Sequence, residues 1–134
     1  YAHTLQLLQH QHALIVHGAG LDEFALHGPS HVIGVDGNSL TEYTVTPSDF
    51  GLSEYPLEAI VGGSPLENKA AIAAVFNGQG QPAHQAAIAM NAGAILHLAG
   101  IADSFTQGAE LALESMSLSK PMATIQASAL LSQA

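Results

Sequence analysis

A short apolar strand that runs directly into glycines is the feature that most constrains this chain. The run Ala13–Val16 is followed by His17-Gly18-Ala19-Gly20, and then by the adjacent carboxylates of Asp22 and Glu23. In open α/β sheets, ligands bind beyond the carboxyl ends of strands, on the turns that follow them. The pattern therefore predicts a buried strand at residues 13–17 whose end presents two acidic side chains to a ligand.

Asp22 and Glu23 are the candidate metal ligands of the chain. Mg²⁺ takes hard oxygen ligands, and a protein usually supplies one or two carboxylates while water and phosphate complete the shell. The same pair also fits a solvated acidic turn, or the start of a short helix, where carboxylates are favourable. From the residues alone both interpretations stand, and the solvated turn is the more common of the two.

Fixed positive charge is almost absent from the chain. Lys69 and Lys120 are its only lysines, there is no arginine, and the formal net charge is −9. Nucleic-acid binding depends on lysine and arginine contacts to phosphate, so no nucleic-acid partner is expected. The chain can hold a polyphosphate only through bridging metal ions, or with basic groups supplied from elsewhere.

Length and composition indicate one domain at most. The 134 residues are 48% hydrophobic, which is enough for a core and argues against disorder. Only 10% of the residues are charged, against about 25% in ordinary globular chains, which indicates either an unusually apolar surface or, as we hypothesise, a surface that is partly covered. Neither cysteine nor a signal-peptide pattern is present, and the most apolar stretch is short for a membrane span. We expect a cytoplasmic protein with no membrane partner.

Capping and turn residues predict the elements. Asp36-Gly37-Asn38-Ser39 predicts a hairpin turn. Ser64 with Glu67, and Ser104 with Gln107, predict two capping boxes that open helices. In chain order we expect a helix end at 2–10, a strand at 13–17, hairpin strands at 31–35 and 40–45, helical turns at 48–50 and 57–61, and helices at 65–77, 82–100, 105–118 and 121–134.

Two packing expectations follow from this order. Leu5, Leu7 and Leu8 are the expected buried side chains of the first helix. The alanine- and glycine-rich centre of the helix at 82–100 is expected to contact another helix closely. A lone strand and one hairpin followed by helices is typical of the C-terminal portion of an α/β domain, and it is too little sheet to cover those helices. Further strands are therefore expected outside this chain.

The eight histidines raise a second metal hypothesis. His10 and His12 have the spacing of one strand face, and His27 and His31 have the spacing of one helix face. However, Gly28-Pro29 argues against a helix between the latter pair. No cysteine or third ligand is in register, so a zinc site is not expected.

Several further residues have structural interpretations. Gly18 and Gly20 are expected to serve turn geometry or to let a neighbouring backbone come close. His17 is expected to be a hydrogen-bonded structural residue, with a substrate-facing role as the alternative. Asn91, within an apolar helix, is expected to satisfy a buried backbone group. No Ser-His-Asp or Cys-His arrangement can be assigned, so no catalytic or cofactor-binding residue is predicted.

Four motifs, in this order, resemble the later part of anthranilate phosphoribosyltransferase. They are His17-Gly18-x-Gly20-Leu21-Asp22-Glu23, Leu26-His27-Gly28-Pro29-Ser30-His31-Val32, Thr46-Pro47-x-Asp49-Phe50-Gly51-Leu52 and Gly62-Gly63-Ser64-Pro65-x-Glu67-Asn68. The resemblance implies an α/β fold of the nucleoside phosphorylase and phosphoribosyltransferase type, with residues 1–134 as a single segment from its C-terminal portion. It also implies a magnesium-dependent glycosyltransferase of tryptophan biosynthesis, which transfers phosphoribosyl from phosphoribosyl pyrophosphate to the amine of anthranilate.

The resemblance also implies roles and missing parts. Asp22 and Glu23 match the pair that binds the Mg²⁺ engaging the pyrophosphate of the donor. The family's glycine-rich phosphate loop, its basic residues and its anthranilate-binding arginine have no counterpart here. The helical N-terminal domain that carries the family's dimer interface is absent as well. The intact enzyme is therefore expected to be a homodimer, and this segment is expected to be inactive alone.

Two alternatives of another class stay open. One is a non-catalytic relative of the family that binds nucleic acid, against which the charge and the acidic pair both argue. The other is a stand-alone acidic interaction module built on this fold. Nucleoside phosphorylases share the broader architecture, but the Leu21-Asp22-Glu23 motif and the Thr46–Leu52 motif favour the anthranilate enzyme.

Overall fold

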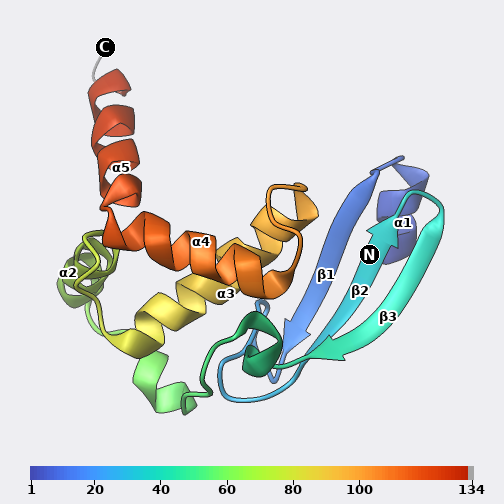
Figure 1. The fold of residues 1–134 in the computed structure, drawn as a ribbon, viewed down its shortest axis with the longest axis horizontal. Helices are drawn as coiled ribbons and strands as arrows, with labels where there is room; N and C mark the ends of the chain where they lie inside the picture. The colour runs from blue at the N-terminus through green and yellow to red at the C-terminus, as the bar shows by residue number, and fades with distance from the viewer. Residues whose placement is uncertain (133–134) are drawn as a thin grey trace.

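The computed structural model describes residues 1–132 and consists of a small sheet beside a group of helices (Figure 1). The elements are α1 Ala2–Leu7, β1 His12–Gly18, β2 Ser30–Asp36, β3 Ser39–Val45, the 3₁₀ helices η1 Pro47–Phe50 and η2 Leu57–Ile60, and the helices α2 Pro65–Phe76, α3 Pro82–Leu98, α4 Phe105–Ser117 and α5 Lys120–Leu131. The predicted strand, hairpin and four following helices are thus confirmed. The predicted end of the last helix, at residues 133–134, lies outside the described residues.

The sheet contains three antiparallel strands in the order β1-β2-β3. The expected hairpin forms between β2 and β3, and Gly37 in its two-residue turn has a φ of 53°. The expectation of a lone first strand is wrong, because β1 pairs with β2 over its whole length, from His12 opposite Asp36 to Gly18 opposite Ser30. A long loop at residues 19–29 makes this pairing possible, because it lets the chain reverse and return beside β1.

Helices α3 and α4 cross with their backbones in contact (Figure 1). A Cβ on Gly93 would lie 2.5 Å from the backbone nitrogen of Ala109, and one on Gly108 would collide with the backbone of Gly93. Only glycine at both positions permits this approach. The close helix contact expected from the small residues of α3 is therefore confirmed, and its partner is α4.

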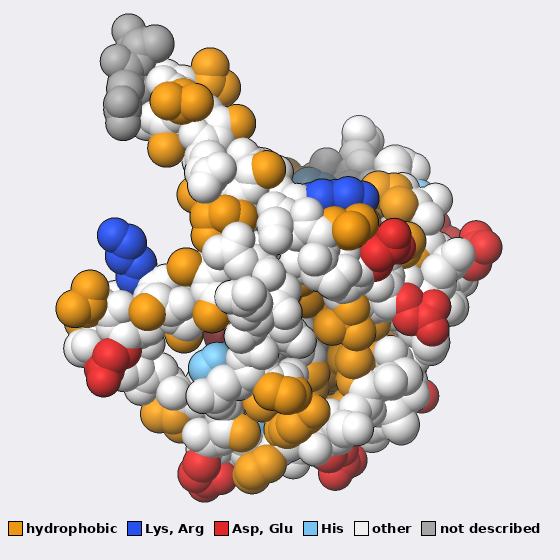
Figure 2. Space-filling model, turned by 60° about the vertical axis from the view of Figure 1, so that its left-hand side comes forward, with side chains coloured by type: hydrophobic (Ala, Val, Ile, Leu, Met, Phe, Trp, Pro, Cys, Tyr) orange, Lys and Arg blue, Asp and Glu red, His pale blue; other side chains and the backbone are white. Residues whose placement is uncertain are grey.

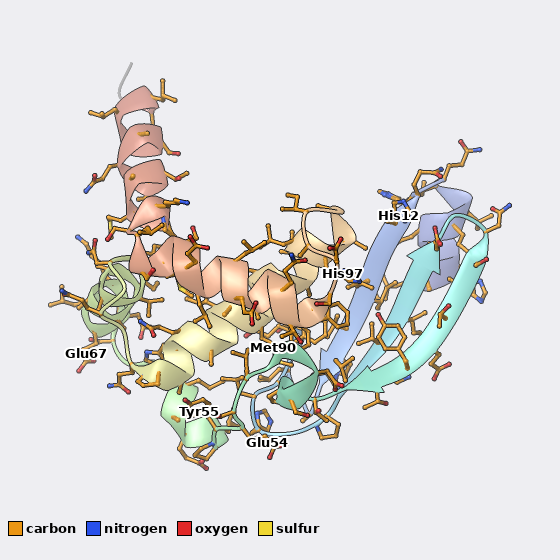
Figure 3. All side chains as sticks on the ribbon, in the orientation of Figure 1. His12, Glu54, Tyr55, Glu67, Met90 and His97 are labelled. Atoms are coloured by element: carbon orange, nitrogen blue, oxygen red, sulfur yellow. The ribbon has the colours of Figure 1, made fainter. Side chains whose placement is uncertain are left out.

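The core lies between the sheet and this helix pair. Val32 and Val45 contribute from the sheet, Phe50 contributes from η1, and Met90 and Met116 contribute from the helices, all at most 5% exposed. Figure 3 shows Met90 on α3 within this central region, whereas Glu67 lies on the far side of α2. Burying Phe50 and Met90 stabilises the fold by about 1.5–3 kcal/mol each.

Two of the four motifs that resemble the phosphoribosyltransferase family contain local capping hydrogen bonds. In the Thr46–Leu52 motif, Asp49 accepts a hydrogen bond from the backbone N–H of Thr46 at 2.7 Å and so begins η1. In the Gly62–Asn68 motif, Asn68 accepts from the N–H of Gly63 at 2.7 Å and donates to its carbonyl at 3.2 Å. These residues shape the loops around the candidate site.

The helix starts agree with the capping signals, with one difference. At α2 the full box forms, because Ser64 accepts from the N–H of Glu67 and the Glu67 carboxylate accepts from the N–H of Ser64. At α4 only half of the box forms. Ser104 accepts from the N–H of Gln107 at 3.1 Å, but the Gln107 side chain accepts from the N–H of Asp103 instead.

The expected burial of the first helix is wrong. Leu7 is 85% exposed and Leu8 is 66% exposed, while Leu5 is only half-buried. The helix α1 is six residues long and packs against β2 at the edge of the molecule, where it buries only Ala2 fully. At the other end of the fold, α5 projects away from the body (Figure 1), and it has no buried residue among those described.

In residues 1–132, none of the helices has the length and apolar character that crossing a membrane requires.

Candidate functional site

The turn after β1 is closed by its own backbone. The N–H of Gly18 donates to the carbonyl of Leu21 at 3.0 Å, and the N–H of Leu21 donates back to Gly18 at 2.8 Å. Both central residues are left-handed, with a φ of 45° at Ala19 and 96° at Gly20. Positive φ at both positions is the signature of a type I′ turn, which reverses the chain within two residues. Asp22 therefore follows immediately beyond the end of the strand.

Gly18 allows the following segment to fold back onto the strand end. A Cβ at this buried position would collide with the carbonyl of Glu23 and lie 2.6 Å from the nitrogen of Ala25. The backbone of the acidic pair thus rests directly on the glycine, as expected from the sequence. Any side chain here would displace the segment that carries the carboxylates.

Phe24 anchors the acidic pair to the core. Its ring is 5% exposed and meets the ring of Phe50 edge-on, with centroids 5.2 Å apart. Its backbone N–H donates to Oδ1 of Asn91 on α3 at 3.2 Å. The Asn91 amide nitrogen in turn donates to the carbonyl of Ala87 at 3.0 Å. The expectation that Asn91 satisfies a buried backbone group is confirmed.

Residues further along the loop fix its return to β2. The N–H of Ala25 donates to the buried hydroxyl of Ser30 at 2.9 Å. The imidazole of His27 reaches back to the turn, with Nε2 3.1 Å from the carbonyl of Ala19. The loop is therefore tied at both ends, although it contains no regular element between β1 and β2.

Asp22 and Glu23 themselves are exposed. Among residues 1–132, no hydrogen bond or ion pair occupies either carboxylate. Their backbone is held by Gly18 and Phe24, while their side chains remain available. This combination of a fixed backbone and free acidic oxygens suits the binding of a cation.

Two adjoining cavities meet at Glu23 and Asn91, which line both of them. The smaller, of about 250 Å³, is bounded by Asp22, Leu14 and Val16 as well as by α3. The larger, of about 520 Å³, runs between α2 and α3 and includes His84. Most of the lining of the larger cavity is aliphatic, and Figure 2 shows apolar side chains gathered in hollows on one face of the molecule. The acidic pair therefore stands at the junction of two hollows.

The donor set fits a cation that keeps much of its shell. No cluster of three or more histidine, cysteine, aspartate or glutamate residues suited to a metal occurs in the described part of the chain. Two carboxylates alone suit Mg²⁺, which usually leaves the rest of its shell to water and phosphate. They do not suit structural zinc, which takes four protein ligands.

Two of the histidines that raised a second metal hypothesis pair with carboxylates. His12 lies 3.3 Å from Asp36, and His31 lies 2.7 Å from Glu42, each across neighbouring strands. His17 is exposed, and in the described structure its ring makes no hydrogen bond, so its expected structural role is wrong.

Positive charge is absent from the walls of both hollows. Neither Lys69 nor Lys120 lines the cavities at Glu23, and the two lysines lie apart from each other (Figure 2). The fixed charges in these walls are therefore only the carboxylates of Asp22 and Glu23, which repel a polyanion.

Sequence reasoning finds the acidic pair but not its supports. No pattern marks Phe24, Ser30 or His27 as a support, and the α3 wall of the site lies more than sixty residues away. These supports depend on contacts that only the folded chain creates.

The chain matches a family model described as "Glycosyl transferase family, a/b domain" over residues 1–120. It is 45% identical over 124 residues to anthranilate phosphoribosyltransferase of Colwellia psychrerythraea, covering 92% of this chain and 34% of that protein. It is 48% identical over 109 residues to the enzyme of the same name from Psychromonas ingrahamii, covering 81% and 32%. The chain thus spans about a third of the length of these relatives and matches their C-terminal part.

Solved structures agree with this match. Anthranilate phosphoribosyltransferase from Thermus thermophilus superposes with a TM-score of 0.76 at 34% identity, over 88% of this chain and 34% of that one. The Saccharomyces cerevisiae enzyme in complex with PRPP and Mg gives 0.78 at 26% identity, over 86% and 33%. The predicted α/β fold class and the resemblance carried by the four motifs are confirmed.

Proposed function

The chain belongs to the glycosyl transferase family, and from this membership we propose that it is a segment of a magnesium-dependent anthranilate phosphoribosyltransferase. The intact enzyme transfers phosphoribosyl from phosphoribosyl pyrophosphate to the amine of anthranilate, a step of tryptophan biosynthesis. Relatives of that name, and a neighbour bound to PRPP and Mg, support the proposal. The 34% coverage of the relative supports the further proposal that residues 1–134 are inactive alone.

The observation that carries the proposal is that Asp22 and Glu23 combine a fixed backbone with exposed carboxylates. Their backbone is fixed by Gly18 and Phe24, while both carboxylates remain exposed beside two hollows. In this role the two carboxylates hold Mg²⁺, which when bound neutralises the charge that develops on the leaving pyrophosphate. The protein needs no nucleophile for such a transfer, because positioning and charge stabilisation provide the catalysis.

In the proposed reaction, the residues of this chain position the metal-binding carboxylates. Phe24 and Asn91 hold the backbone of the acidic pair at the junction of the hollows, where the carboxylates can reach a bound donor. The apolar walls of α3 exclude water from one side of that junction, which strengthens electrostatic interactions within it. The chain contributes no proton donor that the geometry singles out.

The proposal includes parts that lie beyond this chain. Basic groups and the phosphate-binding loop come from a preceding half, and the helical domain of that half joins two copies as a cytoplasmic homodimer. The basic groups and the preceding half are supported by the chain's charge of −9, by the lysine-free hollows and by the length of the relatives.

The experiment compares variants of the intact enzyme that contains this chain. Asp22→Asn combined with Glu23→Gln keeps the shape of both side chains but removes their charge. We expect the rate at limiting Mg²⁺ to fall by two orders of magnitude or more, roughly the contribution of a lost charge-stabilising group. Glu110→Gln, an exposed carboxylate on α4, is the matched control. Unchanged turnover of the double variant at limiting Mg²⁺ would overturn the proposal.

A further inference from the structure

His27 is tied to the turn that precedes the acidic pair. Its Nε2 lies 3.1 Å from the carbonyl of Ala19, eight residues earlier in the chain. The other ring nitrogen, Nδ1, is buried and has no hydrogen-bond partner among the described residues. The remainder of the ring is partly buried in the loop that leads to β2.

This environment assigns the proton to one nitrogen. A carbonyl oxygen only accepts, so Nε2 must carry the hydrogen that His27 donates to Ala19. In the neutral imidazole, Nδ1 is then unprotonated and carries a lone pair. A proton at Nδ1 would be a buried donor without an acceptor, which is the more costly arrangement. The structure therefore selects the Nε2–H tautomer.

The bond acts on a strained part of the turn. Ala19 has a φ of 45°, in the left-handed region that a residue with a Cβ adopts only at a cost in free energy. Its methyl group also lies 3.6 Å from the position that a Cβ on Gly28 would occupy, so the residue after His27 packs against the same turn. His27 and Gly28 thus hold Ala19 from one side.

We infer that His27 is a positioning residue for the metal-binding pair. The hydrogen bond to Ala19 keeps the left-handed turn closed, and the closed turn places Asp22 and Glu23 against Gly18. The inference rests on the proposed function, because it assigns His27 a role at the same site. It concerns the orientation of the carboxylates, and His27 touches neither the metal nor the substrate.

Other histidines offer a contrast within the chain. His31 is nearby in sequence, but its ring pairs with the Glu42 carboxylate across the sheet. His27 alone, of the histidines in the described structure, bonds to the turn that carries the acidic pair. His31→Gln is therefore the matched control for substitutions of His27.

The test uses three variants, namely His27→Leu, His27→Gln and the control. Leucine keeps bulk but loses the donor, while glutamine restores an N–H at the end of a side chain. Mn²⁺, followed by its paramagnetic broadening of amide signals, is the probe for the carboxylates. We expect His27→Leu to raise the Kd for Mn²⁺ about tenfold, as the loss of a supporting hydrogen bond around metal ligands does. His27→Gln should recover most of that loss, and His31→Gln should bind as the wild type does.

Two readouts need no metal. The ¹⁵N chemical shifts of the imidazole report the tautomer, and hydrogen exchange of the Leu21 amide reports closure of the turn. We expect the Nε2–H tautomer in the wild type and faster exchange at Leu21 in His27→Leu, with exchange at Val32 in β2 unchanged. An Nδ1–H tautomer, or unaltered exchange and Mn²⁺ affinity in a folded His27→Leu variant, would overturn the inference.

The two proposals fail in different ways. If Mn²⁺ binding survives Asp22→Asn with Glu23→Gln, the proposed function fails, and with it the metal arm of this experiment. The tautomer and the exchange of Leu21 still decide whether His27 holds the turn.

Discussion

The backbone N–H of Phe24 donates to the side chain of Asn91 at 3.2 Å, across 67 positions of sequence. This bond joins the loop after β1 to the middle of α3. Since Phe24 directly follows Glu23, the bond sets where the acidic pair stands relative to the helices. The same asparagine also donates to Ala87, so one side chain satisfies two backbone groups.

Replacing Asn91 with alanine should destabilise the protein by about 1–3 kcal/mol, because the partly buried N–H of Phe24 loses its acceptor. Urea denaturation followed by far-UV circular dichroism measures the change. Asn77→Ala is the control, since Asn77 is exposed and its side chain bonds only to Ala73 at the end of α2. Equal losses in the two variants would contradict the anchoring role of Asn91.

Gly18→Ala should destabilise the protein by about 1–3 kcal/mol, because the new methyl group would be forced against the backbone of Glu23 and Ala25. Thermal unfolding in the absence of metal isolates this steric effect from ligand binding. Gly34→Ala serves as the comparison within the same sheet. A Cβ at Gly34 would find its nearest neighbour at an ordinary 3.6 Å, in the ring of Tyr43. A loss at Gly34 as large as that at Gly18 would show that strand glycines in general resist substitution here.

Gly108→Ala tests the crossing of α3 and α4 through the sign of its effect. In a helix interior, alanine is normally more stable than glycine by about 1 kcal/mol. Here the methyl group would collide with the backbone of Gly93, so we expect a net loss of stability of about 1–3 kcal/mol. Guanidinium titration gives the sign directly. A stabilised Gly108→Ala variant would mean that the two helices do not touch as described.

The start of α2 should weaken in acid. Hydrogen bonds from the Ser64 hydroxyl and from the Ser64 backbone N–H lower the pKa of the Glu67 carboxyl below its ordinary value of 4.5. A lowered folded-state pKa means that the ionised form stabilises the folded protein above pH 4.5, and that this contribution is lost as pH falls through the folded-state pKa. The NMR titration of Glu67 should therefore have a midpoint below 4.5.

The matched variant for this pH effect is Ser64→Ala, which removes the hydroxyl donor but keeps the carboxylate. Its Glu67 midpoint should move back toward 4.5, because only the backbone donor remains. Glu67→Gln should make the protection factors of the first amides of α2, which are corrected for the intrinsic exchange rate, independent of pH in this range. A wild-type midpoint at or above 4.5 would contradict the capping box.

Local signals predicted the boundaries of the elements well, for a physical reason. Caps such as Ser64 with Glu67 and turns such as Gly37-Asn38 act between neighbours in sequence, so their residues identify them directly. The half-formed capping box at Ser104 shows where prediction from such local signals ends. The glutamine there has two backbone amides within reach, and the structure selects that of Asp103.

Long-range relationships could not be predicted in the same way. The pairing of β1 with β2 depends on how the loop at residues 19–29 returns, and nothing in the strand pattern specifies its partner. The predicted burial of Leu7 and Leu8 was wrong, because apolar spacing identifies the hydrophobic face of a helix but does not show whether another element covers that face. The sequence singled out Asp22 and Glu23 as candidates, while the bond from Phe24 to Asn91 required the fold.

The two hollows share three lining residues, Glu23, Asn91 and Ile95. A ligand in the groove between α2 and α3 changes the surroundings of a carboxylate that also faces the smaller hollow beside Asp22. By thermodynamic linkage, an occupant of one hollow that alters the affinity of the other is altered in return by the same factor. Under the proposed function, the affinity for the cation would therefore change when a ligand fills the groove, and the affinity for that ligand would change with the cation.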